Sequence, residues 1–318
     1  MKPVADPSFW GGLRVVVTGG SGFLGSFVVD RLREAGAEVR TFRSSQYDLR
    51  SAEACDALMA EARPQVVVHC AVDGGGIGYM RAHPASIYTN NVLMNTNVFH
   101  AAWAAGVERF CGVSSVCAYP RDAPVPMREG DVWTGYPEPS NAAYGLSKRM
   151  MVEQGIAYRQ EHGFQSCFPM PVNLYGPRDE FDPERSHVVP ALIRKCLHAK
   201  RSGQDHVVAW GTGRATRELL YVEDCADAVI KMAERVVEPE AINLGTGVET
   251  TVRELVETVA AVCGFTGEIR WDTTKPDGQP RKCLDVSRAR ERFDWSAQVS
   301  LEEGLARTVT WAQHEGIL

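Results

Sequence analysis

The chain of 318 residues is 44% hydrophobic and 23% charged, which is typical of a globular protein with a sizeable core rather than of a disordered or fibrous chain. Its formal net charge of −6 offers no basic excess for nucleic acid or an anionic membrane surface. It has no apolar run of membrane-spanning length and no secretion signal, and its nine cysteines show neither zinc-site spacing nor a disulfide framework. These features predict a soluble, cytoplasmic protein without a metal site.

Strands and helices alternate through the first half of the chain, which predicts βαβ units and a parallel sheet. The predicted strands are Arg14–Thr18, Glu38–Phe42, Gln65–Cys70 and Arg109–Ser114. The predicted helices are Phe23–Ala35, Ala52–Ala62 and Asn141–His162, the last behind a cap at Ser140 or Asn141. After Pro171 the pattern loosens, and a smaller lobe is predicted from strands His206–Trp210 and Gly267–Asp272 and helices Val188–Ala199 and Val252–Cys263.

The first predicted strand runs directly into a glycine-rich turn and a helix, with glycines three residues apart at Gly19, Gly22 and Gly25. Such glycines permit a tight turn, close approach of the backbone to a pyrophosphate and close helix packing, while the helix N-terminus favours the anion. The strand-turn-helix context makes this motif more specific than a lone glycine pattern. It predicts a dinucleotide site that includes Gly19, Ser21, Gly22, Phe23, Leu24 and Gly25.

The end of the second predicted strand bears on the choice of cofactor. No acidic residue follows Phe42 to bind a ribose 2′-hydroxyl, and Arg43 stands there instead, which favours NADP. Arg43 as a solvated surface charge is the competing interpretation, and NAD stays possible. Asp48 and Leu49 follow at a position suited to the adenine amino group.

Tyr144 and Lys148 lie four residues apart on one predicted helix, so both side chains project from the same face. A nearby ammonium is expected to lower the pKa of the phenol, which can then exchange a proton with a carbonyl or alcohol oxygen. Ser115 follows the predicted strand Arg109–Ser114 at the edge where ligands collect in open parallel sheets, and its hydroxyl can hold the same oxygen. Together the three side chains predict a catalytic site.

These residues carry a family resemblance. The glycine turn, Ser115 and the segment Tyr144-Gly-Leu-Ser-Lys148 resemble the extended short-chain dehydrogenases/reductases that modify nucleotide sugars, and the chain is similar nearly end to end to the GDP-L-fucose synthase family. The more specific segments are Gly75-Gly76-Ile77, Ser115-Val-Cys117-Ala-Tyr-Pro120, Asn173-Leu-Tyr-Gly-Pro177, Ser186-His-Val-Val-Pro190, Trp210-Gly-Thr-Gly213 with Arg217-Glu218, and Lys275-Pro-Asp-Gly-Gln-Pro-Arg-Lys282.

The resemblance implies a fold and a domain organisation. The fold is an α/β, Rossmann-type, doubly wound parallel sheet with a smaller α/β C-terminal substrate lobe. Residues 1–173 and about 218–246 form the dinucleotide-binding domain, and residues 174–217 and 247–318 form the nucleotide-sugar-binding lobe. The family further implies a homodimer that pairs the helices within Val92–Ala105 and Tyr144–Tyr158.

The resemblance also implies roles for individual residues. Ser115, Tyr144 and Lys148 form the reductase triad, and Cys117 and His187 form an acid/base pair for epimerisation, since a C4 ketone acidifies the protons on both neighbouring carbons. Tyr144, Lys148 and His187 also contact the cofactor. Without the resemblance, Cys117 reads as an inert core thiol and His187 as a surface or capping histidine.

The GDP moiety is assigned by the same resemblance to the later segments. Asn173 lies near the diphosphate, Arg217 binds a phosphate, Trp210 contacts the guanine or its ribose, and Lys275 closes over the site. Core packing of Trp210 and a solvated loop position for Lys275 are the alternatives.

Three departures from the family pattern bear on specificity. Gly20-Ser21 stand where a basic residue often helps to hold the 2′-phosphate, so the preference for NADP rests mainly on Arg43. Val116 replaces a second serine, and Asp73 replaces a basic residue, both near the expected sugar pocket. The substrate could therefore be a relative of the usual keto-deoxymannose.

The sequence supports an NADPH-dependent enzyme that epimerises C3 and C5 of a GDP-4-keto-6-deoxy sugar and reduces C4. One alternative is a single-function 4-reductase, dehydrogenase or epimerase acting on a related GDP-deoxysugar or GDP-heptose. The other is a catalytically silent sensor that binds a dinucleotide. The expected partners are the GDP-linked sugar and a second copy of the chain, with no nucleic acid and no membrane.

Overall fold

A computed structural model describes residues 5–275 and 277–317, so Pro276 of the predicted Lys275–Lys282 motif lies outside the described residues. Its main feature is a six-stranded parallel sheet with the order β10-β5-β4-β3-β1-β2. The strands are β1 (Arg14–Thr18), β2 (Glu38–Arg40), β3 (Val66–His69), β4 (Arg109–Gly112), β5 (Gln165–Pro171) and β10 (Glu240–Leu244). The strand order reverses between β1 and β3, and a ligand binds beyond the carboxyl ends of the strands at such a switch point.

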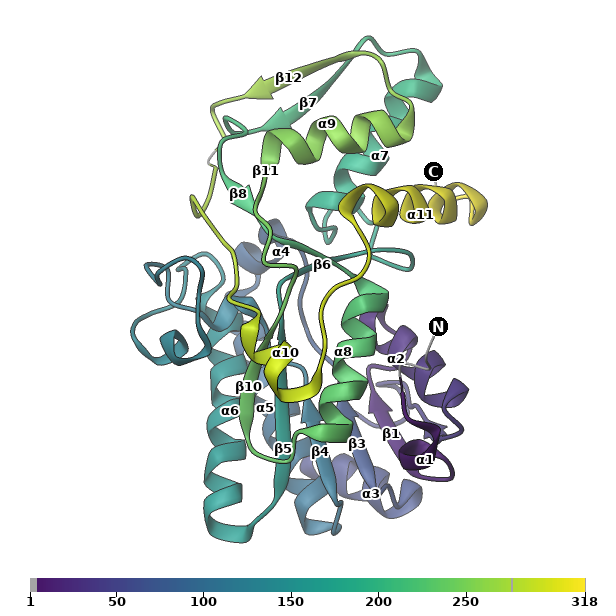
Figure 1. The fold of residues 1–318 in the computed structure, drawn as a ribbon, viewed down its shortest axis with the longest axis vertical. Helices are drawn as coiled ribbons and strands as arrows, with labels where there is room; N and C mark the ends of the chain where they lie inside the picture. The colour runs from purple at the N-terminus through teal and green to yellow at the C-terminus, as the bar shows by residue number, and fades with distance from the viewer. Residues whose placement is uncertain (1–4, 276, 318) are drawn as a thin grey trace.

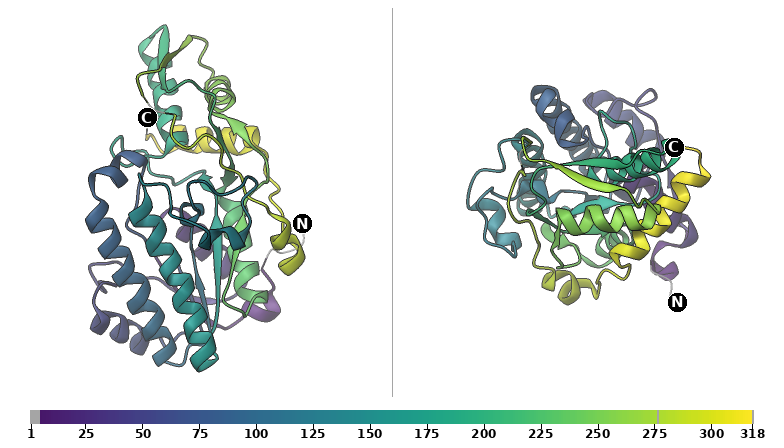
Figure 2. Two further views of the ribbon diagram at one scale, coloured as in Figure 1. Left: turned by 90° about the vertical axis from the view of Figure 1, so that its left-hand side faces the viewer. Right: turned by 90° about the horizontal axis from the view of Figure 1, so that it is seen from above.

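Helices cover both faces of this sheet (Figures 1 and 2). Side chains alternate along β1: Val15 and Val17 are buried in a core with α2 (Phe23–Glu34) and α8 (Val222–Arg235). Val16 is buried in a second core on the opposite face. The helices of that face are α3 (Ala52–Ala62), α5 (Pro84–Ala104) and α6 (Ala142–His162). The near-continuous apolar strands follow from burial on both faces.

A smaller lobe stands at the carboxyl edge of the sheet, because β5 and β10 lead into it at their C-terminal ends (Figure 1). Three two-stranded ladders belong to it or connect it: β7 (His206–Trp210) with β12 (Glu268–Asp272), β8 (Thr216–Arg217) with β11 (Thr250–Thr251), and β6 (Asn173–Tyr175) with β9 (Leu219–Tyr221). Its own apolar core lies among α7 (Val188–Ser202), α9 (Val252–Cys263) and α11 (Leu301–His314).

The predicted fold class is confirmed, and several predicted elements match to the residue, such as Arg14–Thr18, Ala52–Ala62 and Val252–Cys263. The lobe boundaries stay a prediction. The short helix α10 (Ser287–Phe293), from the segment assigned to the lobe, contacts α8 and β10, and its Ala289 and Phe293 are buried in the core of the sheet domain. Within the described residues, no helix is both long and apolar enough to cross a membrane.

Candidate active site

The glycine turn after β1 is packed so closely that side chains at its glycine positions would clash with the backbone. Gly19 has φ +67°, and a Cβ on Gly25 would lie 2.1 Å from the Gly19 carbonyl oxygen. Gly22 is the N-cap residue of α2, and no side chain of the described residues makes a capping hydrogen bond to the first helical turn. An exposed helix N-terminus beside a glycine turn suits the diphosphate of a dinucleotide. The residues present therefore fit the predicted cofactor.

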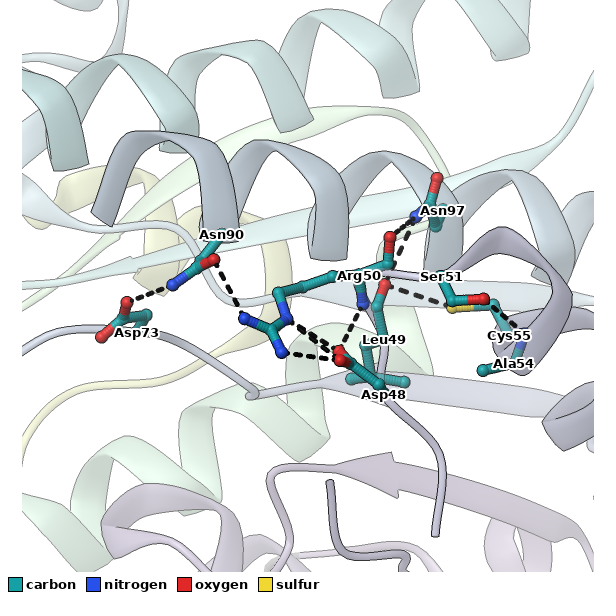
Figure 3. A network of polar contacts seen from close by, with 9 residues as sticks. All are labelled: Asp48, Leu49, Arg50, Ser51, Ala54, Cys55, Asp73, Asn90 and Asn97. Atoms are coloured by element: carbon teal, nitrogen blue, oxygen red, sulfur yellow. Dashed lines mark hydrogen bonds and ion pairs between the residues drawn. The ribbon is translucent and has the colours of Figure 1, made fainter. Parts of the chain in front are cut away.

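The carboxylate of Asp48, which the sequence predicts at the adenine, is held by Arg50 (Figure 3). Arg50 Nε donates to Asp48 Oδ1 over 2.9 Å and Nη2 donates to Oδ2 over 2.7 Å, and these hydrogen bonds lower the pKa of Asp48 to about 2. Arg50 also reaches Asn90 of α5, whose amide donates to Asp73 over 2.8 Å. The carboxylate proposed for the adenine amino group is therefore ionised and fixed in place.

Arg43 is exposed, and its backbone N–H donates to Gln46 Oε1 over 3.0 Å. Within residues 5–275 and 277–317, its guanidinium makes no hydrogen bond or ion pair. Arg40, the last residue of β2 and three residues before Arg43, instead pairs with Glu61. Of the two arginines, Arg43 is the one whose charge stays available to a phosphate.

Ser115 lies just beyond β4, where it caps the short 3-10 helix Val116–Ala118, and its Oγ accepts from the Cys117 N–H over 3.2 Å. Lys148 of α6 is 2% exposed and donates from Nζ to the Val113 carbonyl over 2.8 Å. Its Nζ lies 5.7 Å from the centre of the Tyr144 ring. Burial lowers the pKa of Lys148 to about 8. The predicted trio thus meets at the carboxyl edge of the sheet.

Tyr144 titrates in the opposite direction from the one predicted. Burial raises the pKa of its phenol, the nearby Cys117 raises it further, and the interaction with the Ser115 hydroxyl lowers it only in part. The predicted direction is wrong, because burial of the phenol outweighs the lowering of its pKa expected from the Lys148 ammonium, which donates to the Val113 carbonyl. Tyr144 therefore holds its proton at neutral pH, which suits a proton donor.

Cys117 is half-buried and packs directly against the helix that carries Tyr144. A Cβ on Gly145 would lie 2.1 Å from the Cys117 carbonyl oxygen, so only glycine allows this approach. The Asn141 amide donates to Cys117 Sγ over 3.2 Å. Asn141 is the N-cap of α6 but makes no capping bond with its side chain, which is turned to the thiol instead. The sequence indicated Asn141 only as a cap, so this contact was missed.

A glycine loop contacts both the Tyr144 ring and the segment that leads into His187. Gly74 lies against the Tyr144 ring, since a Cβ there would be 3.9 Å from Cε2. Gly76 donates its N–H to the Arg185 carbonyl over 2.7 Å, and a Cβ on Gly76 would lie 2.3 Å from the Ser186 carbonyl oxygen. The imidazole of His187 is half exposed. His187 is the N-cap residue of α7, but its side chain makes no capping hydrogen bond among the described residues. The glycines thus bring the histidine segment to the side of Tyr144.

In the lobe, Trp210 is 60% exposed, which rules out the core-packing alternative. Lys195 and Lys275 lie over its ring, with Nζ 5.5 and 5.6 Å from the centroid. Lys275 is therefore a neighbour of Trp210 rather than an isolated loop lysine. Lys195 was not predicted, because on the amphipathic helix α7 it reads as a solvated charge. Nothing local in the sequence shows that β7 brings Trp210 beside it.

Arg217 and Asn173 lie where the lobe joins the sheet domain. Arg217 Nη1 donates to the carbonyls of Thr216 and Gln279, and Nη2 donates to the carbonyl of Asp277, so this side chain holds the loop that follows Lys275. Asn173 Nδ2 donates to the Glu218 carbonyl over 3.0 Å. The structure does not bring either residue to Tyr144, and their contacts with a diphosphate stay a prediction.

The two departures expected at the sugar pocket have different environments. Val116 is 2% exposed and its side chain belongs to the apolar core, so its nearness to the sugar pocket stays a prediction. Asp73 is half-buried, with Tyr79 donating to one carboxylate oxygen over 3.0 Å and Asn90 to the other over 2.8 Å (Figure 3). Its carboxylate anchors the loop that contains Gly74 and Gly76.

The doubly wound sheet, the glycine turn and the Ser115, Tyr144 and Lys148 side chains define a nicotinamide-dependent enzyme of the dehydrogenase/reductase type. The chain belongs to the NAD dependent epimerase/dehydratase family, whose model matches residues 15–245.

The chain is also similar over nearly its whole length to several named proteins. It is 39% identical over 299 residues to GDP-L-fucose synthase 1 of Arabidopsis thaliana, covering 94% of this chain and 92% of that one. It is 36% identical over 308 residues to GDP-L-fucose synthase of Escherichia coli, covering 94% and 96%. A solved structure of a GDP-L-fucose synthetase from Naegleria fowleri bound to NADP matches with a TM-score of 0.85 at 28% identity, covering 95% and 94%. The resemblance stated from the sequence is confirmed.

Proposed function

We propose that this enzyme epimerises C3 and C5 of GDP-4-keto-6-deoxy-D-mannose and then reduces C4 with NADPH, which gives GDP-L-fucose. The observation that carries the proposal is that candidate residues for epimerisation and for reduction lie on neighbouring segments around Tyr144. Cys117 packs against the helix of Tyr144 through Gly145, and Gly74 and Gly76 hold the His187 segment beside the same tyrosine. A reductase alone needs only the tyrosine, lysine and serine. The names of the full-length relatives support the same substrate.

The cofactor is held by the glycine turn and the first turn of α2, with Arg43 on the 2′-phosphate and Asp48 and Leu49 at the adenine. When bound, NADPH supplies the hydride for C4. Lys148 and Tyr144 bind at the nicotinamide end, where the ammonium of Lys148 orients the ribose hydroxyls. The guanidinium of Arg43, exposed and without a partner among residues 5–275 and 277–317, favours NADP over NAD.

For epimerisation, one of Cys117 and His187 removes a proton from the carbon beside the ketone, and the other returns a proton from the opposite face. The electrons of the broken C–H bond move to the C4 oxygen, where Ser115 and Tyr144 stabilise the enolate as hydrogen-bond donors. The Asn141 amide donates to Cys117 Sγ and so fixes the position of the thiol beside the helix of Tyr144. The half-exposed His187 can exchange its proton with water between the two epimerisations.

For reduction, Tyr144 donates the proton that the new C4 hydroxyl needs. Its raised pKa keeps the phenol protonated at neutral pH, which fits work in the direction of reduction. The positive charge of Lys148 then stabilises the phenolate left behind.

The GDP moiety lies over the lobe, with the guanine or its ribose on the exposed face of Trp210. Lys195 and Lys275, both over that ring, place two positive charges where the phosphates leave the nucleoside. The chain as a whole carries a net charge of −6, so this local charge is what attracts the anionic substrate.

The proposal is tested with purified protein, NADPH and GDP-4-keto-6-deoxy-D-mannose, with proton NMR of the product. We expect NADPH oxidation and GDP-L-fucose. With Cys117→Ser we expect at least a tenfold loss of epimerised product, while Cys263→Ser, at a buried thiol of α9 in the apolar core of the lobe, serves as the control. Reduction without inversion at C3 and C5 would instead support the single-function reductase, and binding of NADPH without any turnover would support the sensor.

A further inference from the structure

A buried carboxylate beside His187 has no role so far. Asp179 is 2% exposed at its side chain, and its Oδ1 accepts from the Glu180 N–H over 2.7 Å. Its Oδ2 is fully buried and has no hydrogen-bond partner among the described residues. A buried carboxylate oxygen without a hydrogen-bond partner is costly, and a ligand or a side chain that moves to it would remove this cost.

The side chain placed to complete it is His187. The Nδ1 of His187 lies 3.8 Å from Asp179 Oδ1, and the ring is half exposed on its other side. A movement of about 1 Å would bring the pair to hydrogen-bond distance, and catalytic hydrogen bonds in ligand-free enzymes are often long by this amount. Because His187 makes no capping bond in α7, its imidazole is free to turn toward the carboxylate.

The residue before Asp179 has an unusual backbone conformation. Arg178 has φ +66°, in the left-handed region that non-glycine residues rarely adopt. Its guanidinium makes an ion pair with Asp30 over 2.8 Å and lies 4.5 Å from the centre of the Phe27 ring, both on α2. The helix that begins at the glycine turn therefore also fixes the position of Asp179.

We propose that Asp179 is the positioning residue of His187. In the substrate complex it accepts a hydrogen bond from Nδ1–H, which leaves Nε2 facing the sugar, and it stabilises the imidazolium. Either direction of proton transfer needs this charge: His187 becomes an imidazolium when it takes a proton from the substrate carbon, and starts as one when it returns a proton. This proposal rests on the function proposed above and adds a residue that acts through His187.

The test compares Asp179→Asn with the wild-type enzyme in two partial reactions. Epimerisation is followed as the incorporation of deuterium from D2O at C3 and C5 of GDP-4-keto-6-deoxy-D-mannose, in the presence of NADP+. Hydride transfer is followed as NADPH formation from GDP-L-fucose and NADP+, which needs no epimerisation. We expect about a 100-fold loss of deuterium incorporation and less than a threefold change in hydride transfer. Asp179→Glu should recover part of the loss, and Glu180→Gln, an exposed neighbour, should change neither reaction.

A spectroscopic measurement separates positioning from a merely structural role. In the wild-type enzyme, 15N NMR of His187 should show the proton on Nδ1, and in Asp179→Asn the asparagine amide can donate to Nδ1, which moves the proton to Nε2. An unchanged tautomer, or deuterium incorporation within threefold of wild type, would overturn the proposal. If Asp179→Asn does not fold, Asp179→Ala, which removes the acceptor for Nδ1–H, is judged by the same two readouts. A wild-type enzyme without any exchange at C3 and C5 would contradict the proposed function instead.

Discussion

Burial sets the chemistry of the two ionisable residues on α6. The raised pKa of Tyr144 and the lowered pKa of Lys148 have the same first cause, since a buried site disfavours both a phenolate and an ammonium. At neutral pH the phenol of Tyr144 is therefore uncharged, and the Lys148 ammonium loses its proton more easily than an exposed lysine does. This state is prepared to give a proton to a ketone oxygen, and it costs the enzyme stability.

Burial of the Lys148 ammonium lowers the free energy of unfolding, so replacing this lysine by an apolar residue should stabilise the protein. The unfolded chain binds this proton up to about pH 10.5 and the folded protein only up to about pH 8, so stability should rise with pH between the two values. Below pH 8 the full cost applies, which is about 3 kcal/mol at most. Lys148→Met should therefore raise the free energy of unfolding at pH 7 by about 1–3 kcal/mol, after loss of the bond to the Val113 carbonyl, and abolish reduction.

Denaturant unfolding at pH 7 and pH 10 measures this effect, and the difference between variant and wild type should shrink at the higher pH. Lys200→Met is the matched control, because Lys200 donates to the Cys263 carbonyl over 3.0 Å but is exposed. A Lys148→Met protein that is less stable than wild type at pH 7, or a difference independent of pH, would contradict the role of burial.

Arg43 carries the prediction for cofactor choice. Arg43→Ala should raise KM for NADPH by about 10- to 100-fold, the usual worth of a charge-assisted hydrogen bond, and leave KM for NADH unchanged. Steady-state kinetics with both cofactors provide the measurement. Arg40→Ala, whose guanidinium is paired with Glu61, is the control. Equal changes for both cofactors would show that Arg43 does not contact the 2′-phosphate.

At the scale of elements, close approaches through glycine bring the predicted residues together. Gly145 lets α6 contact Cys117, and Gly76 lets the loop after β3 contact the segment of His187. These contacts join parts of the chain that are 28 and 110 residues apart (117 to 145, and 76 to 186). The elements form from local patterns, but the site forms only where glycine removes the side chain between them.

Gly76→Ala tests this arrangement. Its Cβ would lie 2.3 Å from the Ser186 carbonyl oxygen, so the His187 segment must move, and a displacement of about 1 Å can cost about 100-fold in rate. We expect epimerisation, measured as deuterium incorporation at C3 and C5, to fall much more than hydride transfer from GDP-L-fucose. Gly78→Ala, with open space at its Cβ, should behave like wild type. Equal loss in both reactions would mean that the segment serves the whole site.

The sequence predicted what depends on local pattern. The β1 strand, the glycine turn and α2 follow from alternation, glycine spacing and helix periodicity, and the residue types at 115, 144 and 148 indicate their chemistry. It did not predict features that depend on distant neighbours. Lys195 beside Trp210, Asn141 on Cys117 and Asp179 behind His187 each need the fold to place them. The predicted direction of the pKa shift of Tyr144 was wrong, because the spacing of residues in the sequence does not show how deeply the phenol is buried.

At the scale of the whole molecule, the exposed face of α5 and α6 carries apolar side chains that no described element covers. Tyr88, Leu93, Met150 and Ile156 are 38%, 40%, 46% and 37% exposed, and Tyr88 contacts Met150 across the two helices. We propose that this face pairs with the same face of a second chain, which would bury the patch in a four-helix contact.

The dimer is tested by its mass. The 35.0 kDa chain should sediment at twice this mass, and Leu93→Lys with Ile156→Lys should shift it toward the monomer because two buried charges per chain would lie unpaired at the interface. Val208→Lys, an equally exposed apolar site on β7, is the control. A monomeric wild-type protein at micromolar concentration would contradict the proposal.

The measurement that tests the central claim most directly is a single turnover of GDP-4-keto-6-deoxy-D-mannose with NADPH in D2O, followed by NMR of the product. One site that holds Cys117 and His187 beside Tyr144 should give GDP-L-fucose with deuterium at C3 and C5 and hydrogen from NADPH at C4. A reduced product with the original configuration and no deuterium at C3 or C5 would show that the site reduces without epimerising, and would contradict the account.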